Sequence, residues 1–345
     1  MDNKEVKTLK DLAEYTGFTI ATVSRVLNEL GSKYRISEKT QNIIKNAAIE
    51  KKFSFNENAR GLRLNKTFTI GLLVPDISNA FFSKIASLID REAKRNKYSV
   101  FLCDCDNSTI TEKSSVTLLE NRKVDGVIAF PVGLEFKHLL DLNKNTPVIF
   151  IDRFFENIDI PYVTTDDYEG SCKAVQHLID LGHKKIACIQ GLQGTSQNNN
   201  RVNGYINTLL KNNIQINKNL IIGNNFDEIS GYKAAKKLIK MKLNEKPTAI
   251  LSLSNIITLG ILKAFSESNI IIPEQISIIS FDEESYSALL NPPLTTISQP
   301  KEDIGKLAFK MLLKQIKSKN NTKVDSIILP TKLILRNSTK RHINN

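Results

Sequence analysis

The chain has few of the residues that build disulfide frameworks, metal sites or membrane spans. No run approaches the roughly 18 apolar residues of a membrane span, and the first residues, MDNKEVKTLKDLAEY, lack the apolar core of a signal peptide. None of the four histidines has H-x-x-x-H spacing, so hydrolytic metal chemistry is not expected. The only cysteines, without metal-ligand spacing and too few for a disulfide scaffold, are Cys103, Cys105, Cys172 and Cys188. We therefore expect a cytoplasmic protein with reduced thiols and with neither metal nor other cofactor.

Sequence signatures of common enzyme classes are also missing. There is no G-x-G-x-x-G after a strand-like run, no G-x-x-x-x-G-K-[ST] and no G-x-S-x-G. No residue pattern therefore supports an enzyme.

Positive charge is abundant and concentrated near the amino terminus. The 345 residues include 48 Lys and Arg against 36 Asp and Glu, a net charge of +12. Residues 1–66 contain 13 basic and 8 acidic residues, so the net charge per residue there is about three times that of the rest. A small basic module before a larger body is typical of a nucleic-acid reader.

Three short helical patterns make up this module. Thr8 and Asp11 fit a capping-box start, and the first helix should end at Gly17. Thr19 is placed to cap a second helix, TIATVSRVLN, and Ser37 a third, SEKTQNIIKNAAIEKK. Because a tight turn containing glycine separates the first two, we predict a helix-turn-helix over residues 1–55.

The second helix of such a motif enters the major groove with its amino-terminal residues over the base edges. Here Ile20 and Ala21 suit thymine methyl groups, and Arg25 suits the O6 and N7 atoms of guanine. The alternative is that Arg25 is a surface residue on a purely structural three-helix bundle.

After residue 67 the pattern changes to apolar runs of strand length that alternate with amphipathic helices. This alternation predicts an α/β body with parallel sheets, and its length favours two lobes. The runs are FTIGLLVP (68–75), SVFLCDC (99–105), GVIAFP (126–131), PVIFID (147–152), YVTTD (162–166), KIACIQG (185–191), TAILSLS (248–254) and ISIISFD (276–282).

The segment KTLKDLAEYTGFTIATVSRVLN resembles the helix-turn-helix of the lactose/galactose repressor (LacI-type) family. The resemblance continues through ARGLR, FTIGLLVPDISNAFF, KVDGVIAFP, VIFIDR, LIDLGHKKIACIQG, ISIISFDE and NPPLTTISQP, and so covers essentially the whole chain. It implies a helix-turn-helix domain (1–55), a hinge helix and linker (56–67), and a two-lobed core like the periplasmic binding proteins (68–345). We expect lobe 1 to comprise about 68–161 plus 293–320, and lobe 2 about 162–292 plus 321–345.

The resemblance also implies which residues contact DNA. In the hinge helix Leu62 would be the wedge between base steps of the minor groove, with Ala59 close to it. Phe55 stands where the family usually has proline, and a plain flexible linker is the alternative. The implied DNA-binding residues are Leu9, Thr19, Ile20, Ala21, Thr22, Ser24, Arg25, Asn28, Ala59 and Leu62.

An effector site is implied between the lobes, where strands of open α/β sheets end. Its implied residues are Asn79, Phe81, Phe82, Asp152, Arg153, Arg201, Asn255, Asp282 and Gln299. The family usually has Asp at the position of Asn255. Alternatives remain: Asp152 and Arg153 as a structural ion pair, and Phe81 or Phe82 as plain core.

The resemblance thus implies a homodimeric repressor that binds a palindromic operator and responds to a small molecule, most simply a sugar or sugar derivative. Effector binding would close the lobes and separate the hinge helices. The alternatives are a purine or nucleoside effector, a co-repressor, and a solute-binding protein of the same core fold.

Overall fold

The structure, a computed structural model, describes residues 6–53, 66–318 and 324–342. The chain divides into two compact units, Met1–Thr67 and Phe68–Asn345. The predicted hinge helix, with Ala59 and Leu62, lies outside the described residues. Among the described residues no helix is long and apolar enough to cross a membrane.

The first unit contains α1 (Leu9–Thr16), α2 (Ile20–Leu27) and α3 (Glu38–Glu50). The predicted caps are present: the amides of Asp11 and Thr22 donate to the hydroxyls of Thr8 (3.2 Å) and Thr19 (3.1 Å), respectively. Gly17 ends α1 with φ 71°, a left-handed conformation that glycine adopts without steric cost. The three helices enclose a small apolar core of Val6, Leu12, Ala13, Val23, Val26, Ile44 and Ala47.

In the second unit the described strands form two six-stranded sheets, ordered β11-β5-β4-β3-β1-β2 and β12-β10-β9-β8-β6-β7. Neighbouring strands are parallel except for β10 and β12. The first sheet contains β1 (Thr69–Val74), β2 (Ser99–Asp104), β3 (Gly126–Ala129), β4 (Val148–Ile151), β5 (Tyr162–Thr165) and β11 (Ile327–Leu329). The second contains β6 (Ile186–Ile189), β7 (Ile221–Ile222), β8 (Ala249–Ser252), β9 (Ser277–Phe281), β10 (Thr295–Ser298) and β12 (Lys332–Ile334).

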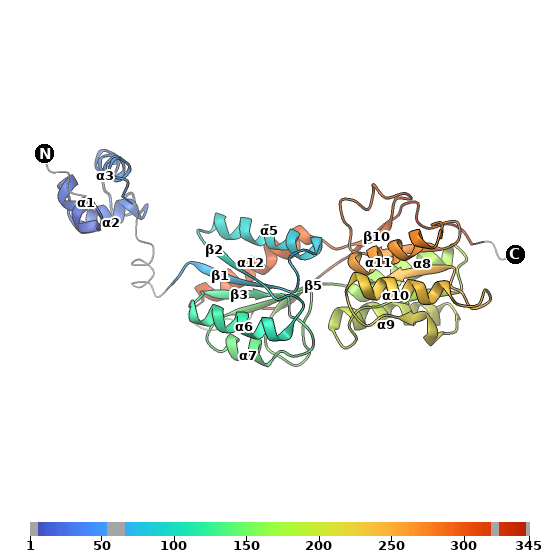
Figure 1. Cartoon of the computed structure of the whole chain (residues 1–345). Helices are drawn as coiled ribbons and strands as arrows, with labels where there is room; N and C mark the ends of the chain where they lie inside the picture. Colours follow the sequence, from blue (N-terminus) through green and yellow to red (C-terminus); the bar gives the residue numbers. More distant parts are fainter. Residues whose placement is uncertain (1–5, 54–65, 319–323, 343–345) are drawn as a thin grey trace. The chain divides into compact units, whose positions relative to one another are not determined.

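Helices cover both faces of each sheet, as buried clusters on either side show. The helices of the first sheet are α5 (Ala80–Arg95), α6 (Thr109–Asn121), α7 (Lys137–Asn143) and α12 (Lys301–Lys317). Those of the second are α8 (Asp167–Asp180), α9 (Ser196–Lys211), α10 (Glu228–Ile239) and α11 (Asn255–Glu267), with a short 3-10 turn, η1 (Lys218–Leu220). Figure 1 shows α12, orange-red and late in the sequence, among the blue and green elements of the first lobe. The α/β fold class with two parallel-sheet lobes is confirmed.

The predicted lobe boundaries are wrong at three strands. Strand β5 was expected in lobe 2 but pairs with β4 of the first sheet, and β10 was expected in lobe 1 but pairs with β9 of the second. Strand β11, expected in lobe 2, pairs with β5. The hydrophobic pattern of a short strand does not specify its neighbour, because the hydrogen-bonding edge available in the folded sheet decides the pairing. Strands β7, β10, β11 and β12 were also not among the predicted strands.

The chain therefore crosses between the lobes after β5, after β10 and after β11. We call the described residues of 68–165 and 301–329 lobe 1, and those of 167–298 and 331–342 lobe 2. The three crossings lie beside one another, since the hydroxyl of Thr165 donates to Gln299 Oε1 (2.8 Å) and that of Thr331 to Asp166 O (3.4 Å).

Candidate DNA-reading surface and interlobe cleft

Helix α2 presents one face to the core of its unit and the opposite face outward. Val23 and Val26 are fully buried, whereas Ile20 is 48% exposed although it is a large apolar residue. Thr19, Ala21 and Arg25 are exposed as well. The start of α2 thus offers apolar and cationic side chains on one accessible face, as major-groove contact requires.

Arg25 is held by an aromatic neighbour that the sequence reasoning did not include. Its guanidinium lies 4.1 Å from the centre of the Tyr34 ring, and Tyr34 is 46% exposed. A stacked guanidinium loses less side-chain freedom when it binds a base. In the sequence, the tyrosine in the loop after α2 was the one feature from which this contact could have been predicted.

Other predicted DNA-contact residues have roles inside the module. The Thr19 and Thr22 hydroxyls lie 2.9 Å apart at the start of α2, and the Asn28 amide donates to Ser24 O (2.6 Å) at its end. Leu9 is half-buried against the core cluster. Their contacts with DNA remain predictions.

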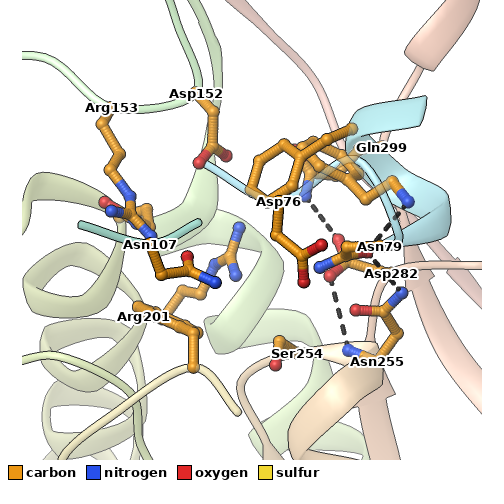
Figure 2. A pocket seen from close by; sticks show the side chains of 14 residues that line it. Asp76, Asn79, Asn107, Asp152, Arg153, Arg201, Ser254, Asn255, Asp282 and Gln299 are labelled. Atoms are coloured by element: carbon orange, nitrogen blue, oxygen red, sulfur yellow. Dashed lines mark hydrogen bonds between the residues drawn. The ribbon is translucent and has the colours of Figure 1, made fainter. Parts of the chain in front are cut away.

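All nine residues predicted for the effector site line a single cleft between the two lobes (Figure 2). The cleft has about 470 Å³ of empty space between its lining atoms, part of it open to solvent. The sequence reasoning missed five further lining residues: Asp76, Asn107, Gln197, Phe226 and Ser254. Asp76 and Asn107 follow β1 and β2, so the strand-end rule that selected Asp152 and Asp282 would have found them.

One side of the cleft is a connected hydrogen-bond network (Figure 2). The Gln299 amide donates to Asp282 Oδ1 (2.6 Å), and the Asn255 backbone amide reaches Asp282 Oδ2 (3.4 Å). The side-chain amide of Asn255 donates to Asn79 Oδ1 (3.2 Å), which joins lobe 2 to lobe 1. These side chains are therefore held in place by protein partners.

Arg201 is also committed to protein partners. Its Nε and Nη2 atoms each lie 2.9 Å from Asp167 Oδ1, and its Nη1 donates to Leu253 O (2.7 Å). The guanidinium also lies 4.2 Å from the centre of the Phe281 ring. Burial raises the pKa of Asp167 to about 7, and the guanidinium of Arg201 opposes that rise. Arg201 thus supports the cleft wall as well as lining it.

Asp152 and Arg153 occupy the other side of the cleft (Figure 2). Within the described residues they form no ion pair with each other, and Arg153 Nη1 donates instead to Pro131 O (3.2 Å). Burial raises the pKa of Asp152 and lowers that of Arg153. Two buried atoms here, Arg153 Nε and Gln197 Oε1, have no hydrogen-bond partner in the described part of the chain. A polar ligand would satisfy this unmet donor and acceptor.

The phenylalanines serve both roles considered from the sequence. Phe81 and Phe82 line the cleft and also belong to the apolar cluster beneath α5. Phe226, from the loop before α10, adds an aromatic surface 5.6 Å from the Arg153 guanidinium carbon. The described residues contain no group of His, Cys, Asp or Glu that is arranged to hold a metal ion.

Comparison with known proteins agrees with this architecture. Residues 8–56 match the model of bacterial regulatory proteins of the lacI family, and residues 175–339 match a periplasmic binding protein-like domain. The chain is 32% identical over 318 residues to the HTH-type transcriptional repressor PurR of Vibrio atlanticus, covering 92% of this chain and 94% of that protein. The chain belongs to the lacI family.

Solved structures of this family superimpose on most of the chain. The Lac repressor dimer bound to operator and the anti-inducer ONPF has a TM-score of 0.82 and 26% identity, covering 96% of this chain and 99% of that one. A lacI-family regulator from Enterococcus faecium with bound ribose has a TM-score of 0.70 and 28% identity, covering 80% and 100%. Like its family, the chain is a DNA-binding transcriptional repressor regulated by an effector, and it is not an enzyme.

Proposed function

We propose that the protein acts in the cytoplasm as a homodimeric repressor whose affinity for a palindromic operator is set by a sugar or sugar derivative bound in the interlobe cleft. The main support for the effector site is that nine residues from distant segments converge on one cleft, where two buried polar atoms have no hydrogen-bond partner among the described residues. A ligand that both accepts and donates hydrogen bonds, as hydroxyl groups do, would satisfy Arg153 Nε and Gln197 Oε1.

The charge around the cleft favours an uncharged ligand. Carboxyl groups outnumber cations among the groups in and directly behind its wall, which are Asp76, Asp152, Asp167, Asp282 and Glu284 against Arg153, Arg201 and Lys301. Arg201 is paired with Asp167, and Arg153 donates a hydrogen bond from Nη1 to Pro131 O. A phosphorylated or acidic sugar would therefore bring a full negative charge into a cleft where burial already disfavours the charged forms of Asp152 and Asp167. We infer a neutral polyhydroxylated effector; the bound ribose of the Enterococcus faecium regulator is consistent with this class.

A purine or nucleoside is the second candidate, because Phe81, Phe82 and Phe226 offer apolar ring surfaces to a flat ligand. Isothermal titration calorimetry of the full-length protein with ribose, galactose, cellobiose, ribose 5-phosphate, gluconate, adenosine and hypoxanthine separates these classes. Binding of a neutral sugar with no binding of its phosphorylated or acidic form supports the proposal. Binding confined to adenosine or hypoxanthine would replace the sugar by a purine.

On the DNA side we propose that the exposed start of α2 reads each operator half-site, with Arg25 pairing with guanine and Ile20 and Ala21 contacting thymine methyl groups. A dimer explains a palindromic site, since two-fold protein symmetry matches two inverted half-sites. The Lac repressor, solved as a dimer bound to operator, is a structural relative of the chain. The division into residues 1–55, 56–67 and 68–345, with Leu62 and Ala59 at the minor groove, is part of the same proposal.

Salt titration of operator binding tests this reading. Each neutralised phosphate contributes about −0.9 to the slope of log affinity against log salt concentration. Selection of binding sites from random duplexes, followed by fluorescence anisotropy at several salt concentrations, should give palindromic sites and a steep negative slope. A flat salt dependence, or sites without two-fold symmetry, would contradict the dimeric operator reader.

A further inference from the structure

A buried ion pair links the two lobes next to the cleft. Lys301 is the first residue of α12, and its Nζ lies 2.7 Å from Oε1 of Glu284 in lobe 2. The two side chains are only 9% and 8% exposed. The Lys301 ammonium also donates to Glu283 O (2.7 Å). Withdrawing both charges from water is costly, so this pair depends on its geometry being maintained.

Each end of the pair is fixed in its own lobe. Helix α12 contributes Ile304, Ala308 and Phe309 to the apolar cluster of lobe 1, so Lys301 moves with that lobe. In lobe 2, the carboxylate of Glu283 accepts hydrogen bonds from Nη2 (2.6 Å) and Nη1 (3.0 Å) of Arg336. This pair fixes the loop after β9, which contains Glu284. The Lys301–Glu284 bond therefore responds directly to a change in the angle between the lobes.

The pair is also connected to the effector-lining residues. Oε1 of Glu284 accepts from Nδ2 of Asn255 (3.3 Å), and that nitrogen also reaches Asn79 across the cleft. The Lys301 ammonium lies 5.7 Å from the centre of the Phe81 ring. An aspartate in place of Asn255 would put a third carboxylate beside Asp282 and Glu284, whereas the amide donates to Glu284 and leaves the pair intact.

We propose that Lys301 and Glu284 form a hinge brace that sets the angle between the lobes and, through Asn255, positions one wall of the effector cleft. The part concerning the lobe angle stands without any effector. Only the part concerning affinity rests on the proposed function of the cleft. The brace accounts for the Asn at position 255, because a side chain that donates a hydrogen bond is needed at this point.

The angle between the lobes is followed through a distance between two spin labels, which double electron–electron resonance spectroscopy measures on the full-length protein. Spin labels at cysteines introduced at the exposed positions Asn145 of lobe 1 and Gln215 of lobe 2 report the separation in a Cys172→Ser background. The other native cysteines are buried. The variants are Lys301→Met, Glu284→Gln and the double substitution, each with a melting temperature. The control is Lys263→Met, which removes an exposed ion pair (3.1 Å) within lobe 2.

We expect Lys301→Met to broaden the distance distribution towards longer separations, since the unpaired Glu284 carboxylate gains solvation when the lobes separate. Glu284→Gln should broaden it less, and the double variant should return the mean separation to the wild-type value because no buried charge is left unpaired. The control should leave it unchanged. If Lys301→Met does not fold, the distance distribution of Glu284→Gln alone tests the brace.

A wild-type distribution in the single variants, even with a lowered melting temperature, would overturn the brace and leave a purely structural ion pair. Ribose titration of the same proteins tests the second arm: we expect a Kd at least about tenfold higher in Lys301→Met and recovery in the double variant. If ribose, galactose and cellobiose all fail to bind the wild type while the distance shifts are observed, the brace stands and the sugar assignment fails. Broadened distances with an unchanged Kd would overturn the link through Asn255.

Discussion

Asp152 and Asp282 occupy equivalent positions in the two lobes. Each is the first residue after the strand that is third in the spatial order of its sheet, counted from β11 or β12; these strands are β4 and β9. Each aspartate has left-handed backbone geometry, with φ 68° for Asp152 and 69° for Asp282. Both side chains face the same cleft. A left-handed aspartate is strained by comparison with glycine, and such strain is tolerated where it places a functional group. The two carboxylates differ in their bonding: Asp282 accepts from Gln299 and Asn255, whereas no side-chain bond holds Asp152 among the described residues.

Replacing Asp152 should separate stability from effector binding. In Asp152→Gly the left-handed residue carries no Cβ and a buried carboxyl group is removed, so the melting temperature should rise. Effector affinity should fall at least about tenfold, because Asp152 lies at the end of the cleft with unpaired polar atoms. Asp152→Ala is the matched control, with the same loss of affinity but a lower melting temperature than the glycine variant. Equal melting temperatures for the two would show that the left-handed geometry stores no strain.

Removing Arg201 should leave the buried Asp167 carboxyl group without its cationic partner. We expect Arg201→Met to lose about 3–5 kcal/mol of unfolding free energy at pH 8. The pKa of Asp167, raised to about 7 by burial, should rise further without the guanidinium. Since the folded pKa lies above the unfolded value of about 3.9, the variant gains stability as pH falls through the folded pKa and loses it as pH rises.

Denaturant unfolding of Arg201→Met at several pH values checks this expectation. Asp167→Asn added to Arg201→Met is the control, and it should restore much of the stability and flatten the pH dependence. A pH-independent deficit in Arg201→Met would mean that the lost Leu253 and Phe281 contacts dominate instead.

His183 should make the core sensitive to acid. Its Nδ1 lies 2.8 Å from the Thr248 hydroxyl and its Nε2 3.1 Å from Lys340 O, and burial lowers its pKa to about 4. Because the folded pKa is below the unfolded value of about 6.5, the unfolded chain binds more protons between these values. Stability present above pH 6.5 should therefore decrease as pH falls towards 4. His183→Gln should be less stable at pH 7.5 but should lose this part of the acid sensitivity, as thermal unfolding across that range can measure.

Arg25→Ala should weaken binding of the selected operator by about 1–3 kcal/mol and relax the preference at one base pair in each half-site. The melting temperature should not change, since Arg25 is exposed. Tyr34→Ala tests the stacked contact (4.1 Å): we expect a smaller loss of affinity at the same base pair, and Tyr34→Phe should retain wild-type affinity. If Arg25→Ala instead weakens binding equally on all duplexes, Arg25 contacts a phosphate rather than a base.

Local signals in the sequence were sufficient for the helix-turn-helix. The caps at Thr8, Thr19 and Ser37 are hydrogen bonds to an amide three residues later, so the chain specifies them without distant partners. The same holds for Asp152 and Asp282, because parallel strands end at a common edge and the last residues of apolar runs can be read directly. The family motifs then predicted, across both lobes, nine residues that line one cleft.

Tertiary structure decided the pairing of strands and the partners of charged residues. The sequence alone did not place β5, β10 and β11, since their sheet depends on which hydrogen-bonding edge the folded lobes leave available. Lys301 appeared only as one more lysine in a basic chain, and the folded structure brings it to Glu284. An ion pair between residues 17 positions apart in different lobes has no local pattern, because it forms only when three chain crossings bring the ends of two sheets together.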